Sequence, residues 1–338
     1  MHRRSLLAAP LLLIAPRLAR AQAEPPPQSA TPALSAVLDR AGGLEPLRTV
    51  LVSRDGETLA ARGYSGGRVD RPTNIKSASK SILAMLAGIA IDKGVLEGAA
   101  QKIAPLLKAD LPADPDPRLY AITLGNLLSM QAGLERTSGA YYGAWIASPN
   151  WVRAALARPF VDEPGGQMLY STGSSHLVSA MLTRASGRST LALARDWLGP
   201  IEGFAIASWE RDRQGVYFGG NQMAMRPTSL LAFAECCRNG GRNRAGQPVI
   251  PEAWIAQCWQ ARTASRFTGD AYGYGWFTRE IDGATAHYGW GYGGQMLYVV
   301  PSRGVSLVMT STVDAPSGRT GHRDDVHVLA GQILAALA

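Results

Sequence analysis

Hydrophobic and polar residues alternate near both ends of the chain, which is the pattern of β-strands that are buried on one face. Near the N-terminus, Thr49–Arg54 and Thr58–Arg62 flank Asp55-Gly56, a dipeptide typical of the turn of a β-hairpin. Near the C-terminus, the same pattern predicts a hairpin around Asp282-Gly283 and another around Pro301–Gly304. Strands are therefore expected at both ends of the chain.

Between these strands, hydrophobic residues recur every three or four positions, which predicts helices. The first helical pattern begins at Ser77 and extends to about Leu107, with an interruption at Gly94. Short helices are also expected at Pro32–Arg40 and Asp324–Leu337. The remaining predicted helices are Leu124–Met130, Trp151–Leu156, His176–Ala185, Ser189–Trp197, Ser229–Cys237 and Pro251–Trp259.

This order of elements predicts an α+β fold. The N- and C-terminal strands would form one antiparallel sheet, flanked by the terminal helices, with a helical domain inserted. In residue numbers, the sheet region is 33–72 plus 270–338 and the helical region is 73–269. A Rossmann fold or an α/β barrel would require strands and helices to alternate throughout, and the middle of the chain does not show that alternation.

The first 23 residues have the pattern of a secretory signal peptide. Arg3-Arg4 precedes a hydrophobic run, Leu6–Pro16, and the segment ends on the small residues Ala21 and Ala23. The run of 11 residues is shorter than the roughly 20 that span a bilayer. The arginine pair is similar to a twin-arginine signal. We therefore expect a signal peptide at 1–23, a proline-rich linker at 24–32, and a periplasmic or secreted protein.

The charge balance gives little support to a nucleic-acid-binding protein. The net charge is +8, from 34 basic and 26 acidic residues, and four of the arginines lie in residues 1–23. Basic clusters of five or more residues are absent from the sequence. The cysteines, Cys236, Cys237 and Cys258, have no metal-site spacing. Either one of the adjacent pair is bridged to Cys258, or all three are free thiols.

Several short motifs of other enzyme classes can be set aside. Gly289–Gly294 matches G-x-G-x-x-G but leads into a predicted strand, whereas a dinucleotide site needs these glycines to open a helix. The sequence has no G-x-S-x-G and no H-E-x-x-H, which weighs against an α/β-hydrolase and a zinc peptidase.

Ser77-Ala78-Ser79-Lys80 is the one S-x-x-K motif of the chain. On a helix, a spacing of three residues brings the two side chains to one face, so the lysine amine can reach the serine hydroxyl. A serine hydroxyl needs a base before it can attack a carbonyl carbon, and a lysine can serve when burial lowers its pKa. Alternatively, Ser77 caps a helix and Lys80 is a solvated charge.

Two further motifs accompany Ser77 and Lys80, namely Tyr170-Ser171-Thr172 and the glycine-rich stretch before Pro301. In order and spacing, the set resembles the class C β-lactamase-like serine hydrolases. That superfamily includes penicillin-binding D,D-peptidases, family VIII esterases and 6-aminohexanoate-dimer (nylon oligomer) hydrolases. The resemblance extends over about residues 33–338, and Tyr170–Leu177 and Gly293–Gln295 are most similar to the nylon-oligomer branch.

The resemblance implies roles for individual residues. Ser77 would be the nucleophile, Lys80 its base and Tyr170 a second proton-transfer group. The oxyanion would be bound by the backbone N–H groups of Ser77 and Tyr292. No metal or organic cofactor is implied.

The sequence departs from the β-lactamase pattern at two places. Thr172 stands where that pattern has asparagine, and the K-T-G triplet of the C-terminal strand is missing. One alignment places Gly289-Trp290-Gly291 at the triplet, and another places His287-Tyr288-Gly289 there. Both lose the lysine that helps to hold a β-lactam carboxylate. We take the following as candidate substrate-binding residues: Thr172, His287, Trp290 and Tyr142.

The sequence therefore predicts an exported serine hydrolase that cleaves an amide or ester bond through an acyl-Ser77 intermediate and resembles 6-aminohexanoate-dimer hydrolases. Its partner would be a small-molecule amide or ester. The alternatives are a family VIII-type carboxylesterase, a β-lactamase or D,D-peptidase on the same fold, and a non-catalytic peptide-binding relative.

Overall fold

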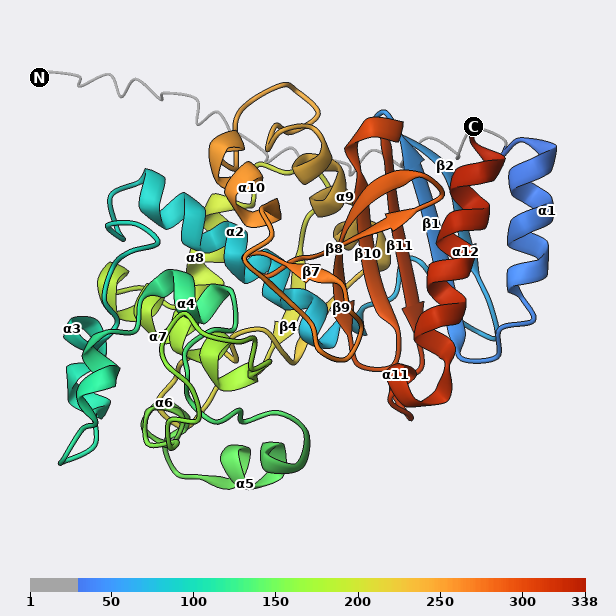
Figure 1. Cartoon of the computed structure of the whole chain (residues 1–338). Helices are drawn as coiled ribbons and strands as arrows, with labels where there is room; N and C mark the ends of the chain where they lie inside the picture. Colours follow the sequence, from blue (N-terminus) through green and yellow to red (C-terminus); the bar gives the residue numbers. More distant parts are fainter. Residues whose placement is uncertain (1–29) are drawn as a thin grey trace, which may run out of the picture.

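The computed structural model describes residues 30–338, so the expected signal peptide and most of the linker lie outside the described residues. The fold is α+β, as predicted, with a large antiparallel sheet next to a helical region (Figure 1). The strand order is β2-β1-β11-β10-β9-β8-β7-β6. The bounds are β1 Leu47–Arg54, β2 Glu57–Gly63, β6 Thr263–Ala264, β7 Ala271–Tyr272, β8 Phe277–Ile281, β9 Ala284–Gly291, β10 Gln295–Val300 and β11 Val305–Ser311.

The three predicted hairpins are confirmed. The β1–β2 turn has left-handed backbone at Asp55 and Gly56, with φ of 50° and 87°, and the β8–β9 turn has the same conformation at Asp282 and Gly283. Two successive left-handed residues match the twist of a hairpin, which explains the Asp-Gly dipeptides. The N-terminal and C-terminal strands are joined in one sheet, because β1 pairs with β11.

Each face of the sheet is covered by helices, and the residues of β10 alternate between two cores. Met296 and Tyr298 pack with α1 (Pro32–Ala41) and α12 (His322–Ala336). Leu297 and Val299 face the helical region on the opposite side. Because both faces are covered, β10 is buried along its whole length.

The helical region contains most of the predicted helices, with shifted ends. Two features of this region were not predicted: α5 and a small sheet of order β3-β5-β4. Helix α9 packs against β11 and β10, although its residues fall in the range expected to form the helical region. The bounds are α2 Ser79–Asp92, α3 Ala104–Leu107, α4 Leu124–Leu128, α5 Tyr142–Ala147, α6 Trp151–Leu156, α7 Thr172–Ser186, α8 Thr190–Trp197, α9 Pro227–Arg238, α10 Glu252–Trp259, α11 Ser317–Thr320, β3 Thr73–Asn74, β4 Ile206–Trp209 and β5 Met223–Met225.

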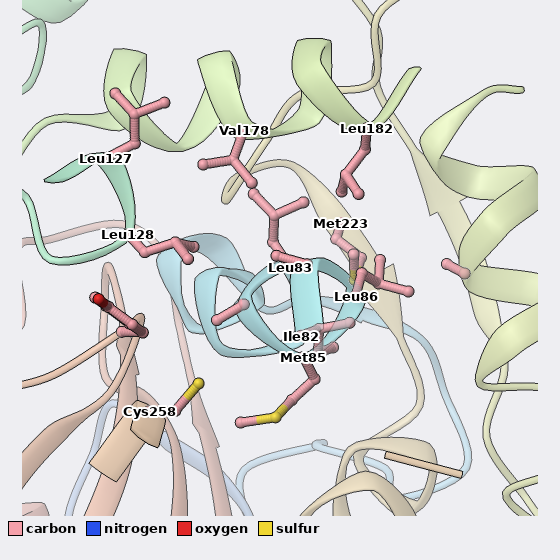
Figure 2. Close-up of a cluster of buried hydrophobic side chains, with 14 of the residues drawn as sticks. Ile82, Leu83, Met85, Leu86, Leu127, Leu128, Val178, Leu182, Met223 and Cys258 are labelled. Carbon is pink, nitrogen blue, oxygen red and sulfur yellow. The ribbon is translucent and has the colours of Figure 1, made fainter. Parts of the chain in front are cut away.

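Helix α2 lies at the centre of the molecule and is buried on all sides over its first three turns. Gly88 lets α10 approach closely, since a Cβ there would lie 2.0 Å from the Trp254 indole. Figure 2 shows α2 side chains meeting those of α4, α7, β5 and α10, namely Ile82, Leu83, Met85, Leu86, Leu127, Leu128, Val178, Leu182, Met223 and Cys258. A helix enclosed in this way is a rigid support for whatever its N-terminal end carries. Within residues 30–338, none of the helices has the length and apolar character needed to cross a membrane.

Candidate active site

Ser77 lies in a 3-10 turn, Lys76–Ala78, that leads directly into α2. The α-helix was expected to begin at Ser77 and in fact begins at Ser79. The turn starts from left-handed backbone at Lys76, with a φ of 50°. Its geometry is fixed locally, because the Lys76 N–H donates to Asn74 Oδ1 at 3.0 Å and the Ser79 hydroxyl donates to the Lys76 carbonyl at 2.7 Å.

The Lys80 amine is buried next to the Ser77 hydroxyl. Its Nζ lies 2.9 Å from Ser77 Oγ, 2.7 Å from the Gly220 carbonyl and 3.5 Å from Thr172 Oγ1. The side chain is 3% exposed, and burial lowers the pKa of Lys80 to about 7. A substantial fraction of the amine is therefore neutral at physiological pH, and a neutral amine can accept the hydroxyl proton of Ser77.

Tyr170 is the third residue of the predicted catalytic set, and the structure brings it to the same place. The Lys80 Nζ lies 5.1 Å from the centroid of the Tyr170 ring. Burial raises the pKa of the Tyr170 hydroxyl to about 12, and its interaction with Ser77 opposes part of that shift. The phenol is thus protonated at neutral pH and is suited to donate a proton.

Thr172 is in the first turn of α7, which begins at this residue and not at His176 as predicted. Its N–H donates to Ser138 Oγ at 2.9 Å, and the two hydroxyl oxygens lie 3.0 Å apart. Thr172 therefore contacts Lys80 and ties the 136–151 segment to the site. Tyr142 reaches the site indirectly, because its hydroxyl accepts a hydrogen bond from Asn221, the neighbour of Gly220.

Strand β9 passes beside the Ser77 turn. A Cβ on Gly291 would lie 2.3 Å from the Ile75 carbonyl, and one on Gly289 would lie 2.7 Å from Ser81 Oγ. Glycine at both positions lets the strand approach the turn. This geometry favours the alignment that places Gly289-Trp290-Gly291 at the K-T-G triplet, with the Tyr292 backbone next. The Tyr292 side chain is 46% exposed.

The described contacts of Trp290 and His287 do not include Ser77, Lys80 or Tyr170. The Trp290 indole donates to Ser317 Oγ at 3.1 Å, and the Arg323 guanidinium lies over its ring. The His287 ring stacks on Trp259 with centroids 4.2 Å apart, and burial lowers its pKa to about 4. Both side chains are half-buried and engaged with these neighbours, so the structure does not bring them together with the Ser77, Lys80 and Tyr170 group, and their binding of substrate stays a prediction.

Several residues at the site were not predicted from the sequence. Gly219-Gly220 supplies the carbonyl that accepts from Lys80, and His176 with Asp212 lies behind it. Lys76, next to Ser77, donates from its amine to Gln222 Oε1 at 2.9 Å. A Gly-Gly dipeptide indicates a turn or a close approach of the backbone, but it does not tell which residue the backbone contacts. The residues that were missed are separated from Ser77 by up to 145 positions, so no local pattern connects them.

Residues 30–338 hold no group of three or more histidine, cysteine or acidic side chains that could bind a metal ion. All three cysteines are buried free thiols, which corrects the alternative of a bridge to Cys258. Burial raises the pKa of the Cys236 thiol to about 12 and also holds that of Cys258 well above its usual value. These thiols are therefore poor nucleophiles.

The sequence and fold were compared with known proteins. A family model described as Beta-lactamase matches residues 39–332. No functionally curated protein matches the sequence. The fold resembles that of a candidate 6-aminohexanoate-dimer hydrolase from Bacillus anthracis, with a TM-score of 0.70 and 16% identity over 88% of this chain and 81% of that one.

Other solved structures are similar to the same degree. A penicillin-binding protein homologue from Caulobacter crescentus has a TM-score of 0.68 and 19% identity, covering 90% of this chain and 97% of its own. A class C β-lactamase from Rhodobacter sphaeroides has a TM-score of 0.67 and 14% identity, covering 90% of this chain and 99% of its own. At these identities the likeness establishes the fold, while the reaction must be argued from the site.

Proposed function

Because the chain belongs to the β-lactamase family, we propose that it is an exported serine hydrolase that cleaves an amide or ester bond through an acyl-Ser77 intermediate. One observation carries the proposal. The Lys80 amine lies 2.9 Å from the Ser77 hydroxyl, and burial lowers its pKa to about 7. A base so placed can activate the hydroxyl at physiological pH.

The first half of the reaction forms the acyl-enzyme. Lys80 takes the proton of the Ser77 hydroxyl while Oγ bonds to the substrate carbonyl carbon. The backbone N–H groups of Ser77 and Tyr292 bind the oxyanion that results. As the carbonyl reforms, the bond to the leaving group breaks, and the leaving nitrogen or oxygen takes a proton from the Tyr170 hydroxyl. The Lys80 ammonium then returns a proton to Tyr170.

The second half consumes one water molecule. Tyr170 and Lys80 together accept a proton from the water as its oxygen bonds to the acyl carbon. The bond between that carbon and Ser77 Oγ then breaks, and Oγ recovers its proton from Lys80. The acid product leaves and every group has regained its starting protonation state, so the chain's own side chains suffice for the cycle.

The substrate we propose is a small linear amide or ester of the kind that a 6-aminohexanoate-dimer hydrolase cleaves. The motifs Tyr170–Leu177 and Gly293–Gln295 resemble that branch, and the B. anthracis structure belongs among the fold's neighbours. Gly289-Trp290-Gly291 has no lysine, so the substrate-binding site at this strand carries less positive charge than the corresponding site of a β-lactamase. Export is supported by the signal-peptide pattern of residues 1–23, and N-terminal sequencing of periplasmic or secreted material should find a chain that begins near Glu24.

A fluorophosphonate probe tests the serine chemistry without knowledge of the substrate. Intact-protein mass should show one adduct on the parent protein and none on Ser77→Ala. The same preparation is then assayed on a panel of esters, linear amides, D-amino-acid peptides and β-lactams. A protein that forms no adduct and turns over no member of the panel would be the non-catalytic peptide-binding relative, and the proposal would be wrong.

A further inference from the structure

The carbonyl of Gly220 is the closest described hydrogen-bond partner of the Lys80 amine, at 2.7 Å. An amine that serves as a base must keep its lone pair directed at the Ser77 hydroxyl, so the position of this carbonyl matters for the proposed reaction. Gly220 belongs to the segment that connects β4 and β5. On either side of Gly219-Gly220 the backbone is held by hydrogen bonds from the Phe218 N–H to the Glu210 carbonyl and from the Asn221 N–H to the Phe218 carbonyl, and side chains around the two glycines add further contacts.

Gly219 and Gly220 lie so close to α7 and Lys80 that a residue with a side chain would not fit at either position. A Cβ on Gly219 would lie 2.2 Å from the Ser175 carbonyl. Gly220 has a φ of 73°, and a Cβ there would lie 2.4 Å from Lys80 Cγ. Because neither glycine has a side chain of its own, neighbouring side chains help to fix the segment, and the Ser175 hydroxyl donates to the Gly219 carbonyl at 2.9 Å.

His176 and Asp212 supply such a contact from behind the segment. The Gly219 N–H donates to His176 Nδ1 at 3.3 Å, and on the other side of the ring Nε2 lies 3.0 Å from Asp212 Oδ2. Both side chains are completely buried. The rings of Trp145, Trp151 and Phe218 lie within 6 Å of the imidazole, centroid to centroid, and separate it from solvent.

The carboxylate determines which ring nitrogen carries the hydrogen. Since Nδ1 accepts from Gly219, the ring hydrogen is on Nε2 and is donated to Asp212. The other oxygen of that carboxylate, Oδ1, accepts from the N–H groups of Gln214 and Val216 at 2.9 and 2.8 Å. Asp212 is therefore fixed by its own turn and presents an acceptor to the ring.

We propose that His176 and Asp212 are a positioning pair that holds the Gly220 carbonyl against Lys80. The inference rests on the proposed function of Lys80 as the base for Ser77. Neither residue touches the reacting atoms. Asp212 fixes the hydrogen of His176 on Nε2, and His176 accepts from the Gly219 N–H. The Gly220 carbonyl, one residue further along the chain, is thereby held against the Lys80 amine.

Asp212→Asn reverses the polarity of this arrangement with almost no change in size. Oδ1 must still accept from Gln214 and Val216, so the new amide NH₂ faces His176 Nε2 and donates to it. The ring hydrogen then moves to Nδ1, where it opposes the Gly219 N–H. His176→Gln also removes the hydrogen bond from the Gly219 N–H. Its side-chain amide can still donate to Asp212, but Gly219 is left with no acceptor.

Ser179→Ala is the matched control. Ser179 is on the same helix, one turn after His176, is equally buried, and its hydroxyl donates to the Tyr217 carbonyl of the same segment at 2.7 Å. It does not contact Gly219 or Gly220 among its described hydrogen bonds. Loss of this hydroxyl should lower the melting temperature, as loss of any buried hydrogen bond does, without moving the Gly220 carbonyl.

The measurement is the second-order rate of fluorophosphonate labelling of Ser77, together with kcat and KM on the best ester of the panel. Asp212→Asn and His176→Gln should each label about 100-fold more slowly and lose kcat with little change in KM, because misplacement of about 1 Å near a catalytic group can cost that much. Ser179→Ala should stay within about threefold of the parent. The acid limb of kcat/KM should move to lower pH in the first two variants, since the Lys80 ammonium loses a hydrogen-bond acceptor.

Thermal unfolding first establishes that both variants are folded. Equal labelling rates for His176→Gln and Ser179→Ala would then overturn the inference. His176→Gln keeps Asp212 paired and so serves as the deciding variant if Asp212→Asn does not fold. Labelling of Ser77→Ala at the parent rate would instead overturn the proposed function. The two failures are thus distinguishable.

Discussion

The Lys80 amine lies close to both the Ser77 hydroxyl and the Tyr170 ring, with Nζ 2.9 Å from Oγ and 5.1 Å from the ring centroid. Burial shifts the pKa values of the two groups in opposite directions. Burial lowers the pKa of Lys80 to about 7 and raises that of Tyr170 to about 12. At neutral pH one can accept a proton and the other can donate one, which is what the two halves of an acyl transfer require.

Lys80→Ala and Tyr170→Phe should each reduce kcat by roughly 100- to 10,000-fold, the range for removal of a general acid or base. If the two residues act in one proton relay, the double variant should be barely slower than the worse single variant, because the relay is already broken. The measurement is kcat for the four proteins on one substrate. Multiplication of the two losses would mean that the residues act in separate steps.

The pH dependence of kcat/KM should follow the protonation of Lys80. The neutral amine is the base, and its pKa is lowered to about 7 by burial, so kcat/KM should rise with pH between about 6 and 8 and then level off. A tenfold fall is expected for each pH unit below the midpoint. A flat profile from pH 5 to 9 would show that Lys80 does not lose a proton before the rate-limiting step.

The same pKa shift predicts how stability varies with pH. Lys80 has a lower pKa in the folded state than the ordinary value of 10.5, so between about pH 7 and 10 the unfolded chain binds more protons, and the free energy of unfolding should rise with pH. Lys80→Met removes the cost of burying the charge and should stabilise the fold by roughly 2–4 kcal/mol at pH 7. Denaturant unfolding at pH 7 and pH 10 measures both effects. A gain that is as large at pH 10 as at pH 7 would contradict this explanation.

Short p-nitrophenyl esters and small linear amides should be better substrates than cephalosporins. Gly289 and Gly291 have no side chains to bind a carboxylate, and the Trp290 indole between them is engaged by Ser317 and Arg323. Loss of a buried ion pair to the drug costs about 2–5 kcal/mol, or roughly 30- to several-thousand-fold in rate. The comparison is kcat/KM for an ester and a chromogenic cephalosporin on one preparation, and a higher value for the cephalosporin would identify a β-lactamase.

Local sequence patterns predicted much of the fold. The Asp55-Gly56 and Asp282-Gly283 turns could be found because their left-handed backbone conformations restrict the residues they accept. Strands β10 and β11 occupy Gln295–Val300 and Val305–Ser311, two runs rich in large apolar and β-branched residues on either side of the Pro301–Gly304 turn. The small β3-β5-β4 sheet was missed, since strands of two to four residues carry too little periodicity to be recognised.

The candidate site was only partly predictable for a different reason. Ser77 and Lys80 are three residues apart, so helix geometry alone places them together. The Gly220 carbonyl and the His176–Asp212 pair are brought to Lys80 by tertiary packing over distances of about 100 residues or more, which no local pattern records. Trp290 and His287 were assigned from the alignment of a motif. In the structure the Trp290 indole donates to Ser317 in α11 and the His287 ring stacks on Trp259, contacts that an alignment does not reveal.

The identity of the nucleophile is tested most directly by turnover of the best substrate by Ser77→Ala beside the parent protein. Ser77 is half-buried in the 3-10 turn before α2, and the described contacts of its hydroxyl are with Lys80 and Tyr170, so the variant should fold with a melting temperature close to that of the parent. Its kcat should fall by at least about 1,000-fold, as expected when an acyl-enzyme cannot form. Activity within roughly tenfold of the parent would show that Ser77 is not the nucleophile.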